Sequence, residues 1–301
     1  MSSATATHST QAPSEGGVAW SRLSQYLLPN DIDSLDNRNE DLIEDLSEFF
    51  GTLAHRYFSF QQRGFDRIPE GAGLYVGNHN GGILSPDTFL FSTQVFQERG
   101  IADIPYALTH EAILQLPLFH QIGTSIGCIR ANHANAAKAF QAGHKVLVYP
   151  GGDEDVFRPY RRRNEVVFGG RRGYIRLALR HNIPIIPVVT AGAHETFLVL
   201  EDFKWLAKIL KTHKVMRTKV WPLVLSLPWG LTLGITPPHL PLPSPVHMEV
   251  VEPFYFARSG EAAARDDAYV DKCAAMVEEV MQDTLTKLAQ ERKEASSFIW
   301  N

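Results

Sequence analysis

The first well-patterned stretch of the chain, between about residues 39 and 59, places apolar side chains three or four positions apart. These side chains are Leu42, Ile43, Leu46, Phe49, Phe50 and Leu53. This repeat is that of one face of an amphipathic α-helix. A phenylalanine-rich stretch follows at 57–65. It can belong to the core or face a membrane, and we expect it in the core.

Short apolar runs then alternate with helical patterns. The runs at 74–77, 105–108, 145–149 and 185–189 predict buried strands, and the segments 86–96, 132–142 and 173–181 predict helices. Ser85, Pro86 and Asp87 have the order of an N-cap followed by a first helical turn. The alternation predicts a single α/β domain over residues 18–301, with a mixed, mostly parallel sheet flanked by helices.

The last third of the chain has a different character. Residues 203–219 mix lysine and arginine with apolar side chains, 221–230 are apolar but contain two prolines, and 237–245 are rich in proline. A strand at 247–251 and a long helix at 261–293 follow. Tryptophans beside basic residues suit a membrane interface with anionic headgroups, so 203–245 is interpreted as a membrane-interface insertion. The alternative is a buried apolar loop beside a solvated basic helix.

Composition narrows the function classes. The 301 residues are 44% hydrophobic and 21% charged, with a net charge of -4, so a general nucleic-acid footprint is absent. The two cysteines and twelve histidines show no metal-ligand spacing, and we expect reduced thiols and no metal. Residues 1–17 predict a disordered leader. Without an apolar spanning segment, we expect a cytoplasmic protein, peripheral on the inner face of the membrane.

His79 is the first candidate for chemistry. It follows the strand at 74–77, at the edge where α/β sheets gather their sites, and Asp87 stands eight residues later. A neutral histidine can take a proton from an alcohol, and a carboxylate on its other nitrogen fixes the tautomer and stabilises the imidazolium. The pair therefore predicts general-base catalysis.

A glycine-rich turn after the strand at 145–149 is the second candidate. It reads Pro150-Gly151-Gly152-Asp153-Glu154-Asp155. Adjacent glycines let backbone N–H groups approach a bound phosphate or the oxyanion of an acyl-transfer intermediate. A basic cluster follows, from Arg158 to Arg172. At least half of these arginines are expected on a solvated face with salt bridges.

Four blocks in this order resemble the glycerolipid (lysophospholipid) acyltransferase superfamily. They are Gly77-Asn78-His79-Asn80-Gly81-Gly82 with Asp87, the segment 126–132, Tyr149-Pro150-Gly151-Gly152-Asp153, and the segment 183–188. They span roughly residues 74–195 and look closest to the monoacylglycerol- and diacylglycerol-acyltransferase-like bacterial branch. The resemblance implies an α/β fold with an acyl-chain tunnel, an acyl-CoA or acyl-carrier-protein donor, a lipid acceptor, and neither a metal nor a covalent acyl-enzyme.

The resemblance also implies residue roles. His79 becomes the base and Asp87 the orienting acid. The substrate-binding positions are expected to be Asn78, Gly81, Gly82, Pro150, Gly151, Gly152, Asp153, Asp155 and Arg158. Among these, the glycine turn corresponds to the acceptor or oxyanion site, and Arg158 to a phosphate ligand.

The sequence departs from the family pattern in two places. Seven residues separate His79 from Asp87, where the commonest signature has four, so Asp153 or Asp155 can serve instead as the partner of His79. The usual Pro-Glu-Gly-Thr-Arg block reads Pro-Gly-Gly-Asp-Glu here. The loss of its glutamate and arginine favours a neutral or unusual acceptor.

Two other functions compete with acyl transfer. Gly123-Thr124-Ser125-Ile126-Gly127 matches a nucleophile elbow, which predicts a serine hydrolase using Ser125 with Asp202 and His239 or His247. Its flanking sequence lacks the expected strand and helix. A non-catalytic lipid-binding protein on the same fold is the other alternative, and the intact His79 and Asp87 argue against it. A P-loop is excluded because the glycine turn lacks the following Lys-Ser/Thr.

Overall fold

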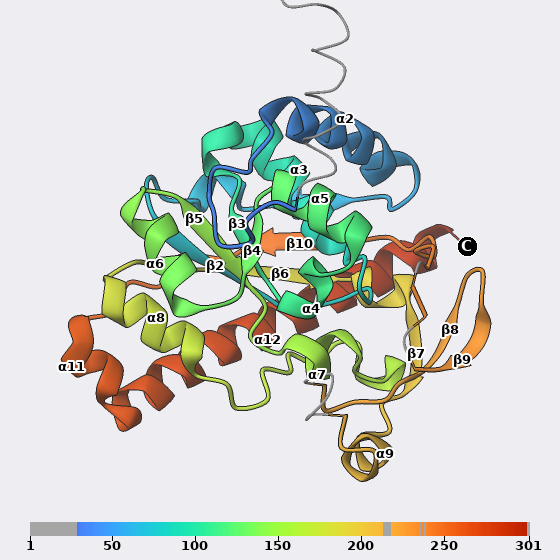
Figure 1. Ribbon diagram of the computed structural model, residues 1–301. Coiled ribbons are helices and arrows are strands. Elements are labelled where there is room, and N and C mark those ends of the chain that lie inside the picture. Colours follow the sequence, from blue (N-terminus) through green and yellow to red (C-terminus); the bar gives the residue numbers. More distant parts are fainter. Residues whose placement is uncertain (1–28, 213–217, 235, 238, 300–301) are drawn as a thin grey trace, which may run out of the picture.

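A computed structural model describes residues 29–212, 218–234, 236–237 and 239–299 (Figure 1). The strands are β1 (Gln61–Arg63), β2 (Gly73–Gly77), β3 (Tyr106–Thr109), β4 (Cys128–Arg130), β5 (Lys145–Val148), β6 (Ile185–Ala191), β7 (Leu198–Glu201), β8 (Leu223–Ser226), β9 (Gly230–Leu233) and β10 (His247–Val250). The α-helices are α2 (Glu40–Arg56), α3 (Pro86–Arg99), α4 (Glu111–Leu114), α5 (Pro117–Ser125), α6 (His133–Gln141), α7 (Gly152–Val156), α8 (Gly173–His181), α9 (Lys204–Ile209), α11 (Gly260–Arg265) and α12 (Asp267–Ile299). Short 3₁₀ turns are η1 (Phe65–Arg67), η2 (Ile101–Asp103), η3 (Tyr160–Arg162) and η4 (Ala193–Thr196).

Seven strands form the central sheet in the order β1-β10-β6-β2-β5-β3-β4. All neighbours are parallel except β10 and β6, which run antiparallel. The central strands β2, β5 and β6 therefore end at the same edge of the sheet. The segments that follow β2 and β5 carry the two candidate turns, and the pairing of these strands brings the turns together.

Helices cover both faces of this sheet (Figure 1). Along β2, Leu74 and Val76 face the layer built from α6, α8, α11 and α12, whereas Tyr75 faces the layer of α2 and α3. The same alternation holds in β5, where Val146 and Leu147 point to opposite layers. Strands buried on both faces explain the nearly continuous apolar runs in the sequence, and the predicted α/β fold is confirmed.

A second, three-stranded antiparallel sheet, β7-β8-β9, projects beside the first (Figure 1). One of its faces is buried against a small cluster that includes Val156, Phe157 and Ile83. These residues flank the two candidate turns, so the small sheet is attached directly to the region of the site. The sequence pattern did not predict these strands, because two prolines interrupt the apolar run that contains β8 and β9.

Most other elements lie where the pattern placed them, with shifts of a few residues at their ends. The phenylalanines at 58, 60 and 65 are buried in the core, as expected. The prediction of one continuous C-terminal helix at 261–293 is wrong in one respect. The first helix, α11, ends at Arg265, and Asp266 takes an extended conformation before α12 begins. The predicted leader at 1–17 lies outside the described residues. No described helix is both long enough and apolar enough to cross a bilayer.

Candidate active site

The backbone of His79 is clamped at the carboxyl end of β2. Its N–H donates to Asp155 Oδ2 at 2.6 Å, and its carbonyl oxygen accepts from Arg158 Nη1 at 2.7 Å. Both partners come from the α7 region, after β5. The pairing of β2 with β5 thus positions the histidine by its main chain and leaves its ring for other contacts.

The ring of His79 is held by two side chains. It stacks on Tyr149, with ring centroids 4.3 Å apart and planes 10° from parallel. Its Nδ1 lies 3.2 Å from Ser85 Oγ. Gly77 makes the stack possible, because a Cβ at that position would lie 2.5 Å from the Tyr149 ring.

Ser85 connects His79 to Asp87. The hydroxyl of Ser85 donates to Asp87 Oδ1 at 2.8 Å, so Asp87 reaches the imidazole through this hydroxyl. As predicted, Ser85 stands at the N-cap position of α3 and Pro86 begins the helix, but the Ser85 side chain, at a residue with a φ of 43°, makes no capping hydrogen bond. Thr88 Oγ1 extends the network, lying 2.9 Å from Ser85 Oγ and 2.7 Å from the Tyr149 hydroxyl.

This network fixes the tautomer of His79. Because the Ser85 hydroxyl hydrogen is given to Asp87, Ser85 Oγ is left to accept from an Nδ1–H of His79. The Nε2 lone pair is then the basic site. Burial, reinforced by repulsion from Arg158, lowers the pKa of His79 to about 3. The ring is therefore neutral at physiological pH, the form that a general base requires.

Asp87 is fully buried. Burial raises the pKa of Asp87 to about 6, and hydrogen bonds from Asn80 Nδ2, Ser85 and the Thr88 N–H partly offset that rise. The carboxylate is consequently ionised at neutral pH and able to stabilise a proton arriving on the imidazole.

Asp155 and Arg158 form a fully buried ion pair at 2.8 Å. Burial raises the pKa of Asp155 to about 6, although Arg158 and the His79 N–H favour its ionised form. The remaining guanidinium N–H groups of Arg158 bind carbonyls of Arg162 and Arg163 and the side chain of Asn80. The predicted phosphate-binding role of Arg158 is corrected on this ground: it has no exposed surface and its donors are engaged within the protein.

The Pro150-Gly151-Gly152 turn lies beside His79, but its groups are partly engaged. Gly151 is required by close packing, since a Cβ there would lie 2.2 Å from the Val167 carbonyl oxygen. The carbonyls of Pro150 and Gly151 accept from Arg171. The Gly152 N–H donates to the Tyr149 carbonyl and is thereby removed as an oxyanion donor.

The three carboxylates proposed as partners of His79 separate clearly in space. Asp87 reaches the ring through Ser85, and Asp155 binds the backbone of His79. Asp153 turns away: its oxygens accept from Arg171 Nη2 at 3.0 Å and from the Lys219 N–H at 2.6 Å. Asp153 is therefore a structural link between α7 and the segment before β8, which corrects its expected place in the site.

The remaining predicted substrate-binding residues around His79 are Asn78 and the two glycines at 81 and 82. Asn78 is buried and exchanges two hydrogen bonds of 2.9 Å with the backbone of Thr190, so it fastens β2 to β6 instead of contacting a substrate as predicted. Gly81 and Gly82 both have left-handed φ angles. A Cβ on Gly82 would lie 3.0 Å from the buried ring of His239, which closes this side of the turn.

Sequence reasoning missed several members of the site. Ser85 was assigned to a helix cap, and Tyr149, Asn80 and Thr88 were given no role. Tyr149 lies within the Tyr-Pro-Gly-Gly block, and Asn80 lies one residue after His79. Their closeness in sequence to the candidate residues was the one signal that could have identified them. Their chemistry depends on the β2–β5 pairing, which no local pattern contains.

The arrangement disfavours the serine hydrolase. Ser125 is the last residue of α5, and β4 begins after it. A nucleophile elbow requires a strand before the serine and a helix after it, the reverse order. Ser125 also precedes β4, which places it at the sheet edge opposite His79.

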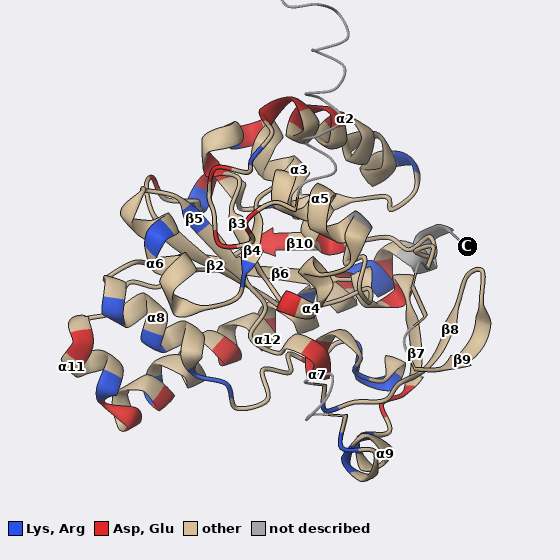
Figure 2. Cartoon of the chain, in the orientation of Figure 1, with Lys and Arg blue, Asp and Glu red and all other residues tan. Residues whose placement is uncertain are grey.

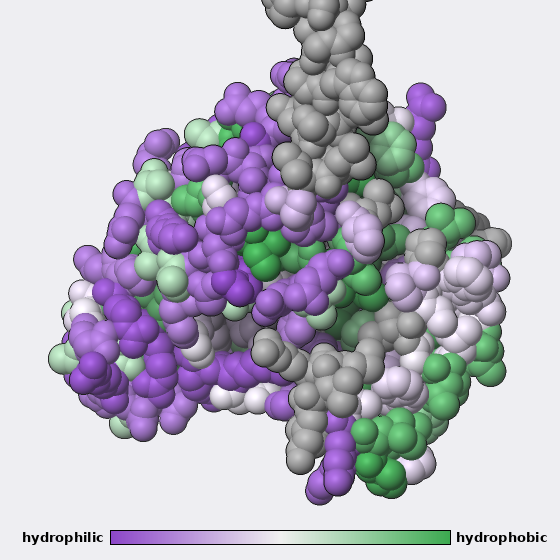
Figure 3. Space-filling model, viewed as in Figure 1, coloured by the Kyte–Doolittle hydropathy of each residue, from purple (hydrophilic) through white to green (hydrophobic). Residues whose placement is uncertain are grey.

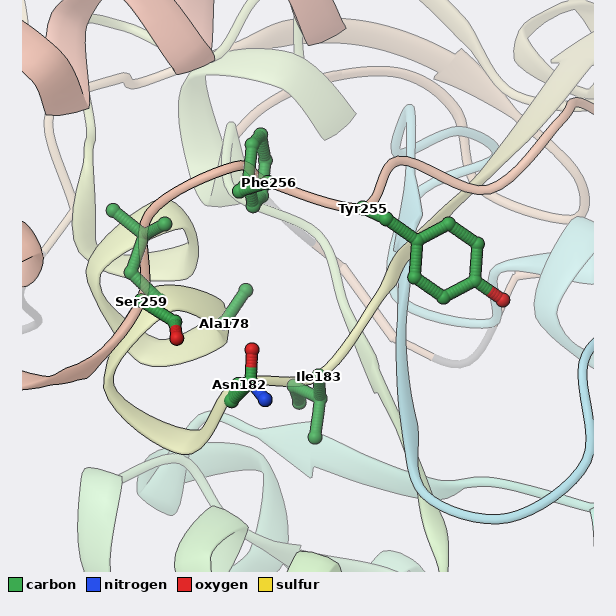
Figure 4. Close-up of a pocket in the computed structure, with 7 residues that line it drawn as sticks. Ala178, Asn182, Ile183, Tyr255, Phe256 and Ser259 are labelled. Carbon is green, nitrogen blue, oxygen red and sulfur yellow. The ribbon is translucent and has the colours of Figure 1, made fainter.

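A small groove lies elsewhere on the molecule (Figure 4). It has a volume of about 50 Å³ and is lined by Asn182, Ile183 and Tyr255, among others. Ile183 precedes β6, so the groove is at the amino-terminal edge of the sheet, away from His79. Within the described ranges, no cluster of three or more His, Cys, Asp or Glu side chains could hold a metal ion.

The chain resembles known proteins in sequence. The sequence model of the family described as Acyltransferase matches residues 59–191, which contain both candidate turns. An uncharacterized protein of Mycobacterium tuberculosis is 27% identical over 85% of this chain and 68% of its own length. The mouse protein named DGAT1/2-independent enzyme synthesizing storage lipids is 25% identical over 50% of this chain, and diacylglycerol O-acyltransferase 2B of Umbelopsis ramanniana is 26% identical over 48%. The chain spans 45% of each of these last two.

Among solved structures, the 1-acyl-sn-glycerophosphate (LPA) acyltransferase PlsC from Thermotoga maritima has a similar fold. The TM-score is 0.51, with 15% sequence identity over 91% of this chain and 88% of the other. At that identity the likeness concerns the fold alone.

Proposed function

We propose that this chain, which matches the Acyltransferase family model over residues 59–191 and resembles diacylglycerol O-acyltransferase 2B, moves a fatty acyl group from an acyl-CoA or acyl-carrier-protein thioester to a hydroxyl of a glycerolipid. The observation that carries the proposal is the neutral imidazole of His79, whose Nδ1 faces the Ser85–Asp87 pair. The proposal includes no metal and no cofactor other than the thioester itself.

In the proposed reaction, His79 Nε2 takes the proton of the acceptor hydroxyl as its oxygen attacks the thioester carbonyl. Asp87 stabilises the resulting imidazolium through Ser85. Amides of Gly81, Gly82 and Gly151 are the proposed oxyanion donors, each contributing about 3 kcal/mol when well placed. Collapse of the intermediate expels the thiolate, which recovers the proton, so no covalent acyl-enzyme is formed.

The acceptor is proposed to be diacylglycerol or a lysophospholipid, with the neutral lipid favoured. Arg158 is buried in its ion pair with Asp155, and Arg171 is engaged by the glycine turn and Asp153. These two arginines beside the candidate turns are thus committed within the protein, which weakens the case for a phosphate-bearing acceptor. We place the enzyme at the inner face of the cytoplasmic membrane, where both thioester donors are found.

The test is thiol release from long-chain acyl-CoA or acyl-carrier protein, with diacylglycerol and a panel of lysophospholipids as acceptors. We expect release that depends on one acceptor class and falls by about 100-fold or more in His79→Ala, with the folded state verified by circular dichroism.

The control variant is Ser125→Ala, which should retain wild-type release. Release that needs no acceptor, disappears in Ser125→Ala and persists in His79→Ala would instead establish a hydrolase.

A further inference from the structure

The outer face of the β7-β8-β9 sheet is built from leucines. Cross-strand register aligns Leu198, Leu225 and Leu231 in one row and Leu223 with Leu233 in the next. Leu225, Leu231 and Leu233 are 42%, 62% and 53% exposed. The opposite face of the same strands carries the fully buried Val199 and Val224. Both faces of the sheet are therefore apolar, but only one of them is covered by the rest of the protein. We call the uncovered side the leucine face.

Further apolar side chains extend the leucine face. Leu227 and Trp229 at the β8–β9 turn are about half exposed. Leu240, whose N–H donates to the Leu227 carbonyl, is 61% exposed. Trp205 and Ile209 on α9 are exposed, as is Leu210 just after it. Of the 17 large hydrophobic side chains exposed in the described structure, ten lie between residues 200 and 240. Figure 3 shows this concentration as green surface over α9 and the β8–β9 hairpin.

Charge bordering the leucine face is predominantly basic, although Lys204 and Lys219 pair with Glu154, and Glu201 at the end of β7 pairs with Arg161. Residues 203–248 contain no aspartate or glutamate and include six lysines and arginines. Within the described residues, β8 and β9 carry no charge at all, and lysines mark α9 (Figure 2). An uncharged aliphatic surface bordered by cations is complementary to a bilayer with anionic headgroups.

We infer that the leucine face rests on an anionic membrane surface and holds the active site against it. This rests on the proposed function, since a glycerolipid acceptor must be taken from such a surface. The buried face of the same sheet contacts Ile83 and Phe157, which stand next to the two site turns. His239 links the segment after β9 to the Gly81 carbonyl, at 3.3 Å. Docking of the leucine face therefore sets the distance between His79 and the lipid.

Side-chain type favours lipid over a protein partner. Protein interfaces concentrate binding energy in tryptophan, tyrosine and arginine, with leucine under-represented, whereas leucine is among the side chains that enter hydrocarbon most readily. Trp205 and Trp229 suit the headgroup boundary. Among the described strands, β7 and β9 are the outer strands of this sheet. Open strand edges are not tolerated in hydrocarbon, so we expect the sheet to lie with its leucine face against the bilayer at shallow depth.

The test is co-sedimentation of the full chain with vesicles of phosphatidylcholine containing about 30% phosphatidylglycerol, against pure phosphatidylcholine. We expect binding to the mixed vesicles, weakened by salt, and at least tenfold weaker partitioning for Leu225→Asp with Leu231→Asp. The matched control, Tyr255→Asp with Met276→Asp, introduces the same charges at exposed apolar positions outside the leucine face and should bind as wild type.

Two further measurements keep the outcome unambiguous. Quenching of the protein's tryptophan fluorescence, which includes that of Trp205 and Trp229, by lipids brominated on their acyl chains needs no destabilising variant, and its absence would overturn the inference. Light scattering of wild type that shows a dimer, lost in the double leucine variant, would also overturn it by assigning the face to a second copy. Binding is measured on the His79→Ala protein as well, so that failure of acyl transfer and failure of membrane docking are distinguished.

Discussion

At the residue scale, the proposed chemistry depends on a hydroxyl between a histidine and a carboxylate. Ser85 Oγ lies 3.2 Å from His79 Nδ1 and 2.8 Å from Asp87 Oδ1. The left-handed φ of Ser85 aims the hydroxyl into this gap. The serine therefore explains how a carboxylate eight positions from His79 can still orient it, since the extra turn formed by the glycines is bridged by one more hydrogen bond.

Removing this bridge should lower turnover with little effect on binding. Ser85→Ala leaves His79 free to adopt the wrong tautomer and separates it from Asp87, so we expect kcat to fall by about 100-fold with KM unchanged. Ser244→Ala, at a buried serine that bonds Gly192 and Glu195, is the matched control. If both variants lost activity equally, in proportion to their loss of unfolding free energy, a positioning role for Ser85 would be refuted.

At the scale of elements, the site is a junction between β2 and β5. The segment after β5 turns at Gly151, enters α7 and returns Asp155 and Arg158 to the backbone of His79. This return is possible only because Gly151 has no side chain, as Asp155 Cβ and the Val167 carbonyl occupy the space a Cβ would need. Glycine at this position is a packing requirement of the β5–α7 turn.

Gly151→Ala should accordingly damage both stability and turnover. A Cβ 2.2 Å from the Val167 oxygen forces the turn to move, and we expect a loss of about 1–3 kcal/mol in the free energy of unfolding, together with reduced thiol release. Urea unfolding and the acyl-CoA assay measure the two effects. Gly173→Ala, at the start of α8 with no atom within 4 Å of the added Cβ, should leave both unchanged. An unaffected Gly151→Ala protein would contradict the packing argument.

At the scale of the whole molecule, folding buries ionisable groups of both kinds. Burial lowers the pKa values of His79, His194 and His239. Above pH 6.5 these histidines are neutral in both states. As the pH falls below that value, only the unfolded chain takes up their protons, so stability is lost. Asp87 and Asp155 act in the opposite sense, because their pKa values are raised to about 6 and the folded state binds their protons first.

The contribution of His79 can be isolated by mutation. Between pH 7.5 and pH 5, wild type should lose about 2 kcal/mol more of its unfolding free energy than His79→Gln, at about 1.4 kcal/mol for each pH unit below 6.5. Urea denaturation at the two pH values measures the difference. His55→Gln, at an exposed position of α2, should follow wild type. Parallel curves for wild type and His79→Gln would show that the His79 ring is readily protonated in the folded state.

Local sequence patterns predicted the parts of this protein that local forces determine. The strand before His79, the helix at 173–181 and the glycine turn each follow from neighbouring residues. The functions of Ser85 and Arg158 did not, because a serine before proline suits a helix cap and an arginine beside others suits a solvated face. Both were reassigned by contacts with residues distant in sequence or by an unusual backbone angle. The β8–β9 hairpin was hidden for a similar reason, since its proline-interrupted leucines match neither a helix nor a buried strand.

The place of β10 in the sheet has a consequence for how the protein is made. β6 pairs with β2 on one side and with β10 on the other, and β1 is attached to the sheet only through β10. A ribosome must therefore add more than fifty residues after β6 before that strand gains its second partner. Until then, β6 is a long apolar edge open to other chains, a state that promotes aggregation. The segment 59–191 that contains the candidate site thus depends for its solubility on β10, which is synthesised after it.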